Sequence, residues 1–482
     1  MAHAAGRSFW NGHQRQLSSG KPGDATRLWV QQIPNDGLLR FYMIGNVERL
    51  LPTSPKALAE VLVHKAYDWK KTDLIAFTLK KITGQGILLV EGDVHRVQRK
   101  NLNPAFSYRH IKELYPVFWE KSIELVQAIE KTVQFLPDGK KIIAVGDWAR
   151  PATLDIIGLA GMGYNFNCIH DSNNLLQREF WKLLSRPPLF SRLLVFLSLF
   201  IYPDLVDYLP LKHTRNAQEA SDRIRSFARQ LIQERKQKLK TDKRNDNIDI
   251  ISIALESGGF SDESLVDQVM TFLAAGHETT STAIQYVIYA LCQHPDMQSR
   301  LRSEIRSNLP SIIMNTNGAP PTPITAAQID SLPYLNAVCN EVLRYYPPAP
   351  FTVRQAARDT TLLNTFIPKG TVLSISMPAV NRNPELWGPD AETFNPDRWL
   401  GPGRANTGGA ESNYAFLTFL HGPRSCIGSA FAKGELACVV AAMVGRFEFE
   451  LEKPDEELEI LEGLTIAPKH GVRVKVKVVE GW

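Results

Sequence analysis

A long helical pattern at residues 262–293 constrains the fold of this chain more than any other feature. Ser261 is placed to cap its start, the first turn is acidic, and Pro295 lies just beyond its end. At 1.5 Å per residue, about 32 residues make a rod of roughly 48 Å. Apart from His277 and Glu278, the middle of the segment is small or apolar. A helix of this length and composition predicts a large domain whose core it crosses.

Helix-like spacing of apolar residues recurs along most of the remaining chain. The other segments with this spacing are 109–136, 150–165, 176–200, 214–240, 295–308, 325–345 and 428–446. Strand-like patterns are confined to residues 28–62, to short pieces after Pro347, and to the C-terminal GVRVKVKVVE, which alternates strictly. We therefore expect a mainly α fold with small β-elements.

The organisation of the chain favours a single domain over residues 1–482, with residues 1–20 as a flexible leader. No Gly/Ser-rich or Pro-rich linker, internal repeat or break in composition divides the chain. The leader lacks the apolar core of a signal peptide or anchor. No stretch reaches the about 18 consecutive apolar residues of a spanning helix. The longest apolar run, residues 193–202, either packs in the core or dips into a membrane surface.

Charge and cysteine usage exclude several classes of protein. The excess of 55 basic over 50 acidic residues, a net charge of +5, is too small to indicate nucleic-acid binding. An odd number of cysteines without a CxxC spacing argues against a disulfide framework or a cysteine zinc site. At least one thiol is therefore expected to be free. The five cysteines are Cys168, Cys292, Cys339, Cys426 and Cys438.

One of these thiols lies in the loop Phe-Leu-His-Gly-Pro-Arg-Ser-Cys-Ile-Gly at residues 419–428, directly before a helical segment. A thiolate at a helix N-terminus gains from the helix dipole and from unpaired backbone N–H groups. Gly422 and Gly428 let the backbone pass close to a flat ligand. Arg424, two residues before Cys426, is placed to pair with an anionic group on that ligand. A lone cysteine is more often an inert buried residue, but this loop favours a ligand-binding thiolate.

The same loop fits the pattern F-x-x-G-x-R-x-C-x-G at every fixed position, beginning at Phe419. It resembles the haem-binding loop of the cytochrome P450 family. The resemblance extends from about residue 20 to 480. It implies the cytochrome P450 fold and haem b (iron protoporphyrin IX) as the cofactor. The haem would lie between the long helix and the cysteine loop, with Cys426 as the iron ligand.

Two further segments carry the resemblance. Glu341 and Arg344, in NEVLRYYPP, share a helix face at a spacing of i, i+3 and resemble the ExxR pair of the family. FNPDRW, at residues 394–399, resembles the family segment between ExxR and the cysteine. The resemblance implies that Arg398 joins Glu341 and Arg344 in a buried charge network with a structural role.

The middle of the long helix reads Ala-Gly-His-Glu-Thr-Thr at residues 275–280. Glycine lowers helix propensity, and threonine hydroxyls compete for backbone carbonyls. The run is either a glycine packing contact beside a bent, solvated face or a local opening that admits water and dioxygen. It resembles the A-G-x-E-T-T oxygen-activation motif, which assigns Glu278 and Thr279 to an acid–alcohol pair and places Ala275 beside the cofactor. We favour the local opening, because both resemblances lead to one site.

The two haem propionates need hydrogen-bond donors. His95 and Arg99 are candidates, spaced i, i+4 on one expected helix face, although the family often has Trp at the position of His95. Arg354, ten residues beyond Arg344, resembles the strand arginine of the family that reaches a propionate. Arg424 completes the set.

The resemblance implies a haem-thiolate monooxygenase, in which Cys426 donates electron density to the iron. Glu278 and Thr279 would deliver protons to bound dioxygen. Electrons would come from a separate NADPH–cytochrome P450 reductase, with cytochrome b5 as a further donor, because no G-x-G-x-x-G joins a strand to a helix. Two alternatives stay open: a haem-thiolate isomerase, dehydratase or peroxide user, and a non-catalytic haem sensor. The intact acid–alcohol pair argues against the first, and a helix opened at its centre argues against the second.

The expected substrate is a lipophilic small molecule such as a terpenoid, polyketide, alkaloid or fatty acid, because the segments that line the pocket in this family are largely apolar here. Residues 153–167 resemble fungal members, whose membrane-bound forms carry an N-terminal anchor that is missing here. We expect a monomer of secondary metabolism in peripheral contact with the cytosolic face of the endoplasmic reticulum. The basic residues expected to steer an acidic reductase are Arg96, Lys100, Arg424 and Lys433.

Overall fold

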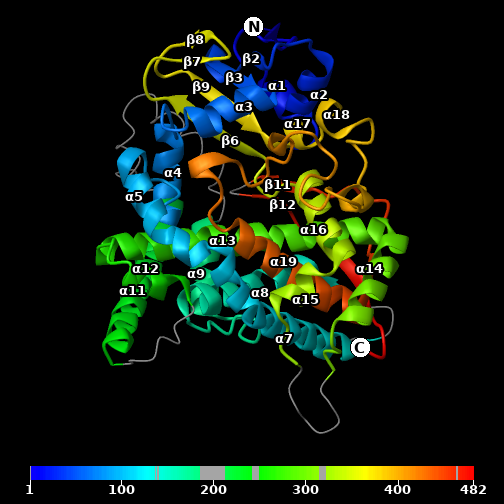
Figure 1. Ribbon diagram of the computed structural model, residues 1–482. Helices are drawn as coiled ribbons and strands as arrows, with labels where there is room; N and C mark the ends of the chain where they lie inside the picture. The colour runs from blue at the N-terminus through cyan, green and yellow to red at the C-terminus, as the bar shows by residue number, and fades with distance from the viewer. Residues whose placement is uncertain are drawn as a thin grey trace. The chain divides into compact units, whose positions relative to one another are not determined.

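The computed structural model of the 482-residue chain describes residues 2–135, 137, 141–184, 212–241, 249–313, 322–462 and 465–482 (Figure 1). The chain divides into two compact units. The first comprises Met1–Lys71, Phe106–Thr153 and Glu278–Trp482, and the second comprises Thr72–Ala105 and Leu154–His277. The described residues form mainly helices and a few small sheets, as expected from the sequence. The apolar run at residues 193–202 lies outside the described residues.

The largest sheet belongs to the first unit and has six strands in the order β1-β2-β3-β9-β6-β4 (Figure 1). One face of the sheet is closed by buried Leu50, Trp69, Leu373 and Ile375, which pack with residues of α3. Within the expected leader, β1 pairs with β2 and His13 is buried. The strands are β1 (Ala2–His3), β2 (Leu38–Tyr42), β3 (Glu48–Pro52), β4 (Trp69–Lys70), β6 (Phe351–Ala356) and β9 (Val372–Ser376), and α3 spans Pro55–Ala59.

Smaller sheets complete the β-structure of the first unit. The C-terminal strand β13 (Arg473–Val478) lies between β10 (Phe447–Leu451) and β5 (Ile142–Ala144). Val474 and Val476 are buried while Lys475 and Lys477 are exposed, which confirms the predicted strand with one wet face. Two further antiparallel strand pairs are β7 (Thr360–Leu362) with β8 (Thr365–Ile367), and β11 (Ile460–Glu462) with β12 (Ile466–Pro468).

The longer helices of the first unit follow the predicted segments, with breaks at prolines, whereas the short helices at Met377–Asn381 and Pro384–Trp387 lie where strand-like pieces and loops were predicted. The segment 109–136 is divided into α6 and α7, and Pro116 occupies the first turn of α7. The segment 325–345 is divided in the same way, because Pro333 starts α16. Proline fits the first turn of a helix but cannot donate from its interior. These helices are α6 (Tyr108–Ile111), α7 (Tyr115–Gln134), α14 (Pro295–Asn308), α15 (Ala326–Asp330), α16 (Pro333–Tyr345), α17 (Met377–Asn381), α18 (Pro384–Trp387) and α19 (Ser429–Arg446).

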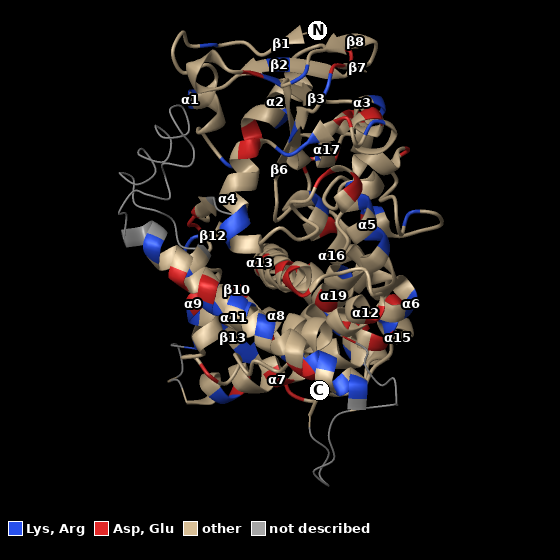
Figure 2. Cartoon of the chain, turned by 90° about the vertical axis from the view of Figure 1, so that its left-hand side faces the viewer, with Lys and Arg blue, Asp and Glu red and all other residues tan. Residues whose placement is uncertain are grey.

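All the regular secondary structure among the described residues of the second unit is helical. Its longest element apart from the shared α13 is α11 (Lys212–Thr241), on which basic and acidic residues are interspersed (Figure 2). The helix α8 (Val145–Ile156), most of which belongs to the first unit, runs on into a π-helical turn at Ile157–Gly161 of the second unit, in place of the single helix predicted over 150–165. The remaining helices are α4 (Asp73–Thr83), α5 (Gly92–Leu102), α9 (Leu175–Leu184) and α12 (Ile250–Glu256).

The long predicted helix is α13 (Asp262–Gln293), whose 32 residues start in the second unit and end in the first. Ser261 caps it as expected, since its Oγ accepts a hydrogen bond of 3.2 Å from the Ser264 backbone N–H. The helix continues through residues 275–280 without a break. A Cβ at Gly276 would lie 3.0 Å from the Ile157 side chain, so this glycine makes the packing contact that was the alternative interpretation. Among the described residues, no helix has the length and apolar character needed to cross a membrane.

Candidate active site

The cysteine loop is closed by its own backbone immediately before α19. Gly428 is the N-terminal cap of α19, and the Cys426 backbone N–H donates to the Phe419 carbonyl at 2.8 Å. Gly422 has φ of +77°, and a Cβ there would lie 2.1 Å from the Leu62 carbonyl oxygen. Only glycine satisfies both conditions. The close approach at Gly422 is therefore to the backbone of the first unit, a requirement that the loop sequence alone did not show.

Burial distinguishes Cys426 from the other four cysteines. Its side chain is exposed, whereas Cys168, Cys339 and Cys438 are buried and Cys292 is half-buried. Burial raises the pKa of the Cys292 and Cys339 thiols to about 12 and that of Cys438 well above its ordinary value. A buried thiol resists ionisation, and the thiolate is the form that binds a metal. Cys426 is therefore the thiol best suited to ligate iron.

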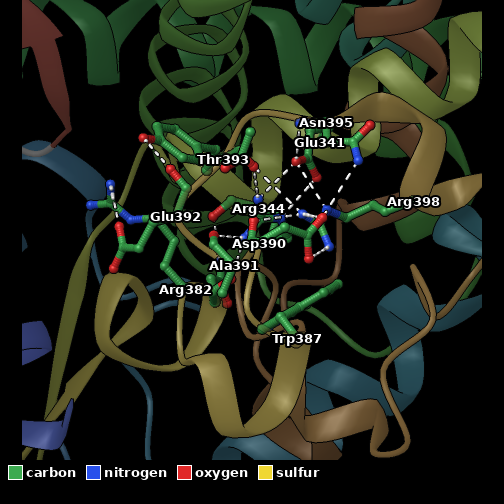
Figure 3. A network of polar contacts seen from close by, with 12 residues as sticks. Glu341, Arg344, Arg382, Trp387, Asp390, Ala391, Glu392, Thr393, Asn395 and Arg398 are labelled. Carbon is green, nitrogen blue, oxygen red and sulfur yellow. Dashed lines mark hydrogen bonds and ion pairs between the residues drawn. The ribbon is translucent and has the colours of Figure 1, made fainter.

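A buried charge network surrounds Glu341 on α16 (Figure 3). Its Oε1 accepts hydrogen bonds from Arg344 Nη2 at 2.7 Å, Arg398 Nε at 3.1 Å and the Asn395 backbone N–H at 2.7 Å. Its Oε2 accepts from Arg344 Nε at 2.8 Å and Trp399 Nε1 at 2.9 Å. The predicted association of Glu341, Arg344 and Arg398 is confirmed. Asn395 and Trp399 are additional donors from the same FNPDRW segment.

The two arginines of the network are held on their other sides as well. Arg344 donates to the backbone carbonyls of Ala391 at 2.7 Å and Thr393 at 2.9 Å. Arg398 pairs with Asp390 at 2.9 Å. Burial works to raise the pKa of Asp390, but the Arg398 guanidinium outweighs it and holds that pKa below its ordinary value. The network thus ends in a partly exposed ionised carboxylate.

Asn381, at the end of α17, connects this network to the start of the cysteine loop. Its Nδ2 donates to the Arg344 carbonyl at 3.1 Å and to Thr418 Oγ1 at 2.8 Å. Its Oδ1 accepts from the Leu417 backbone N–H at 2.8 Å, and Thr418 Oγ1 donates to the Leu343 carbonyl at 2.7 Å. The fully buried amide therefore fixes the approach to the cysteine loop from α16. No motif in the sequence singled out Asn381.

The two proposed proton-handling residues are neighbours on α13 in the first unit, and both are half-buried. Glu278 Oε1 accepts a hydrogen bond of 3.2 Å from Thr465 Oγ1. Thr465 is buried and lies just before β12. The sequence separation of 187 residues explains why no local pattern revealed this contact.

The candidate propionate ligands are distributed over both units. Arg354, on β6 of the first unit, is buried, and its Nη1 donates to Thr352 Oγ1 and to the Val353 carbonyl, both at 2.9 Å. Arg424 lies in the cysteine loop with its guanidinium 5.1 Å from the centre of the Tyr67 ring.

The remaining candidates, Ala275, His95 and Arg99, belong to the second unit. His95 is buried on α5, and Arg99 donates from Nε to Asn103 Oδ1 at 3.0 Å. The roles of these residues at a cofactor stay predictions.

A protein-family model described as Cytochrome P450 matches residues 10–476. The chain belongs to the cytochrome P450 family. It is 52% identical over 479 residues to Cytochrome P450 monooxygenase sphH of Aspergillus fumigatus, covering 99% of this chain and 87% of that protein. It is 40% identical to Cytochrome P450 monooxygenase FSL4 of Gibberella zeae, covering 99% and 88% of the two chains. It is 43% identical to Cytochrome P450 monooxygenase FUM15 of Gibberella moniliformis, covering 94% and 83%.

The family membership confirms the fold and the enzyme class inferred from the motifs. The protein is a P450 monooxygenase, an oxidoreductase that acts with a haem-thiolate cofactor, a small-molecule substrate, dioxygen and a redox partner. The chain contains the kinds of side chain that such a cofactor needs: a thiol to ligate the iron and guanidinium groups to pair with the propionates. An exposed thiol stands at a helix N-terminus, and the same unit contains Arg354 and Arg424, whose guanidinium groups are of the kind that pairs with anionic groups.

Proposed function

We propose that this P450 inserts one oxygen atom of dioxygen into a lipophilic small molecule of fungal secondary metabolism, with haem b held by Cys426. The observation that carries the proposal is the exposed Cys426 thiol, in a loop fixed before α19, in a chain whose other cysteines are buried or half-buried. The similarity to P450 monooxygenases of Aspergillus and Gibberella supports a substrate that belongs to fungal secondary metabolism. Within the lipophilic class, terpenoids, polyketides, alkaloids and fatty acids are the candidates.

When bound, the haem supplies the dioxygen-activating chemistry. The thiolate of Cys426 would ligate the iron, and α19 would stabilise its negative charge. The carboxyl group of Glu278 would take protons from solvent, and the Thr279 hydroxyl would pass a proton on from its Oγ1. The residues proposed to contact the cofactor are Arg424, Arg354, Arg99, His95, Phe419, Gly422, Gly428 and Ala275.

The function is tested with the purified haem protein, NADPH, a cytochrome P450 reductase and ¹⁸O-labelled dioxygen. Lipophilic compound classes are first screened for the spectral shift that accompanies binding next to the iron. We expect a compound that gives this shift to be converted to a product that carries one ¹⁸O atom. Product formed from peroxide alone, with no dependence on NADPH, would instead favour the peroxide-using class.

Substitution of Thr279 by Ala is expected to uncouple the reaction. The thiol, the charge network and the haem spectrum should stay unchanged, because Thr279 is only half-buried and contributes one hydroxyl. The ratio of product to NADPH oxidised should fall by about 10- to 100-fold, with the missing electrons recovered as peroxide. Thr279→Ser, which keeps a hydroxyl, should retain most of the ratio. A parental ratio in Thr279→Ala would show that Thr279 only packs the helix.

We propose a separate NADPH–cytochrome P450 reductase as the electron donor, with cytochrome b5 as a further donor. Of the four cations expected to steer it, Arg96 and Lys100 on α5 are exposed. Lys433 instead lies 5.5 Å from the centre of the Phe416 ring, and burial lowers its pKa. We therefore propose that docking relies on α5 more than on Lys433.

Reduction of this P450 by the reductase is expected to slow several-fold between about 0.05 and 0.5 M salt, because ions screen the attraction between exposed charges. Stopped-flow reduction under carbon monoxide measures the rate. A double variant with Arg96→Ala and Lys100→Ala should be slower at low salt and less sensitive to it, whereas Lys433→Ala should retain the salt dependence. A rate that does not respond to ionic strength would contradict the docking proposal.

We further propose that the protein acts as a monomer in peripheral contact with the cytosolic face of the endoplasmic reticulum.

A further inference from the structure

Three residues on one face of α13 form hydrogen bonds with residues at the start of β12. Thr465 Oγ1 donates to Glu278 Oε1 at 3.2 Å, and Thr282 Oγ1 lies 3.3 Å from Thr465 Oγ1. One turn further along, the Tyr286 hydroxyl donates to the Ile466 carbonyl at 2.8 Å. The three α13 residues are spaced i, i+4 and i+8, so they share one face of the helix. All of these residues belong to the first unit.

The position of Thr465 is fixed by its surroundings as well as by Glu278. Its side chain is buried, and the next residue, Ile466, donates from its backbone N–H to the Pro348 carbonyl at 2.9 Å. The hydroxyl of Tyr286 donates to the Ile466 carbonyl, and the Tyr286 ring stacks on Tyr346 with centroids 4.8 Å apart. Thr465 therefore presents its hydroxyl to Glu278 from a segment that hydrogen bonds to Tyr286 and to the Pro348 carbonyl hold in place.

The chemistry of a hydroxyl suits a carboxyl group that must cycle between two protonation states. Each threonine hydroxyl has one proton and can also accept. While Glu278 is ionised, Thr465 gives its proton to the carboxylate, so Thr282 must be the donor to Thr465. When Glu278 is protonated, both hydroxyls can reverse and the geometry is kept. A Lys or Arg partner has only donors and would favour the ionised form alone.

We propose that Thr465, supported by Thr282, is the positioning residue for Glu278 and holds its carboxyl group in one orientation while that group releases and regains a proton. This inference rests on the proposed role of Glu278 in proton delivery. It also explains how the carboxyl group can transfer a proton in every turnover. The group keeps its hydrogen bond to Thr465 and its orientation from one turnover to the next. The inference also assigns a role in proton delivery to a residue 187 positions away in the sequence.

The first test compares Thr465→Val with Thr465→Ser. The Val variant keeps the shape but loses the hydroxyl, so the product-to-NADPH ratio should fall about fivefold, as expected for one lost hydrogen bond. The substrate-induced spectral shift and its affinity should stay within about twofold of the parent, and Ser should restore the ratio. Thr26→Val is a matched control, because this buried threonine also donates its hydroxyl, to the Gly23 carbonyl at 2.9 Å, in a different part of the first unit.

A second readout needs no turnover. Thermal unfolding of Thr465→Val, Glu278→Ala and the double variant measures whether the two side chains interact. The loss of melting temperature in the double variant should be smaller than the sum of the two single losses, because the shared hydrogen bond is lost only once. If Thr465→Val does not fold, Thr282→Val removes the supporting donor and should change the ratio in the same direction.

The outcomes separate this inference from the proposed function. A parental product-to-NADPH ratio in Glu278→Gln would overturn the role of Glu278 and the positioning role with it. A low ratio in Glu278→Gln with a parental ratio in Thr465→Val, or failure of Ser to restore the ratio, would overturn the positioning role alone. Additive melting losses would likewise show that Thr465 and Glu278 do not depend on each other.

Discussion

Substitution of Glu341 by Ala is expected to lower the free energy of unfolding by about 3–5 kcal/mol and to leave little folded protein at 37 °C. The substitution removes a carboxylate that accepts five hydrogen bonds and leaves Arg344 and Arg398 buried without it. The cost of a buried, uncompensated guanidinium is large compared with the about 5–15 kcal/mol by which a typical native protein is stable. Urea denaturation followed by circular dichroism measures the loss, and the yield of soluble haem protein supports it.

Asp397→Ala provides the matched control for this prediction. Asp397 lies in the same FNPDRW segment and pairs with Arg300 at 2.7 Å, but the two side chains are 57% and 50% exposed. Because water screens such a pair, the substitution should cost less than about 1 kcal/mol. Equal losses in Glu341→Ala and Asp397→Ala would contradict the view that burial makes the network essential.

Substitution of Cys426 by Ala is expected to abolish the thiolate-type absorption band of the reduced, carbon-monoxide-bound protein, together with monooxygenation. The physical reason is that no other cysteine can replace it: the remaining thiols are buried or half-buried, and burial raises the pKa of Cys292, Cys339 and Cys438. The difference between the absorption spectra of the reduced protein with and without carbon monoxide measures the band. The backbone contacts of the loop should persist, since they involve no Cys426 side-chain atom.

Cys438→Ala is the control, because it removes a thiol from α19, the helix that follows the cysteine loop, without changing the loop itself. The band should keep its position and its intensity per haem in this variant. A thiolate-type band that survives in Cys426→Ala would show that the ligand has been assigned wrongly.

The cysteine loop was identifiable from the sequence because its requirements are local. The thiol, the arginine and both glycines lie within ten residues, and the helix they precede has a clear apolar pattern. The same holds for α13, whose cap at Ser261 and terminating Pro295 flank the periodic segment. Periodicity also gave β13 its correct exposed face. Local sequence patterns thus predicted the mainly α fold, and they are also the basis for proposing Cys426 as the thiolate ligand.

Short helices were harder to predict. The helix α4 was not among the predicted segments, although Thr72 caps it by accepting a hydrogen bond of 3.4 Å from the Ile75 backbone N–H. The helix α12 has only seven residues and is capped by Asp249. In both helices the capping residue was the available signal, since too few turns are present for a stable periodicity.

The contacts that Asn381 and Thr465 make with distant segments were beyond any sequence pattern. Asn381 reaches Thr418 across 37 residues, and Thr465 reaches Glu278 across 187. Neither Asn nor Thr is rare in a loop or at a helix end, so nothing in the local sequence separates these two from surface residues. Their roles follow only from the packing of the first unit.

Asn381 has a consequence for attempts to reduce this protein to its haem-binding part. The approach to the cysteine loop is shaped by the Asn381 amide and by the Leu343 carbonyl, neither of which is near the loop in sequence. A synthetic peptide of residues 417–446 would contain the thiol, both glycines and the whole of α19. It would still lack the scaffold that holds Leu417 and Thr418 in place. A shortened haem-binding protein derived from this chain would therefore have to include α16 and α17 as well as the cysteine loop.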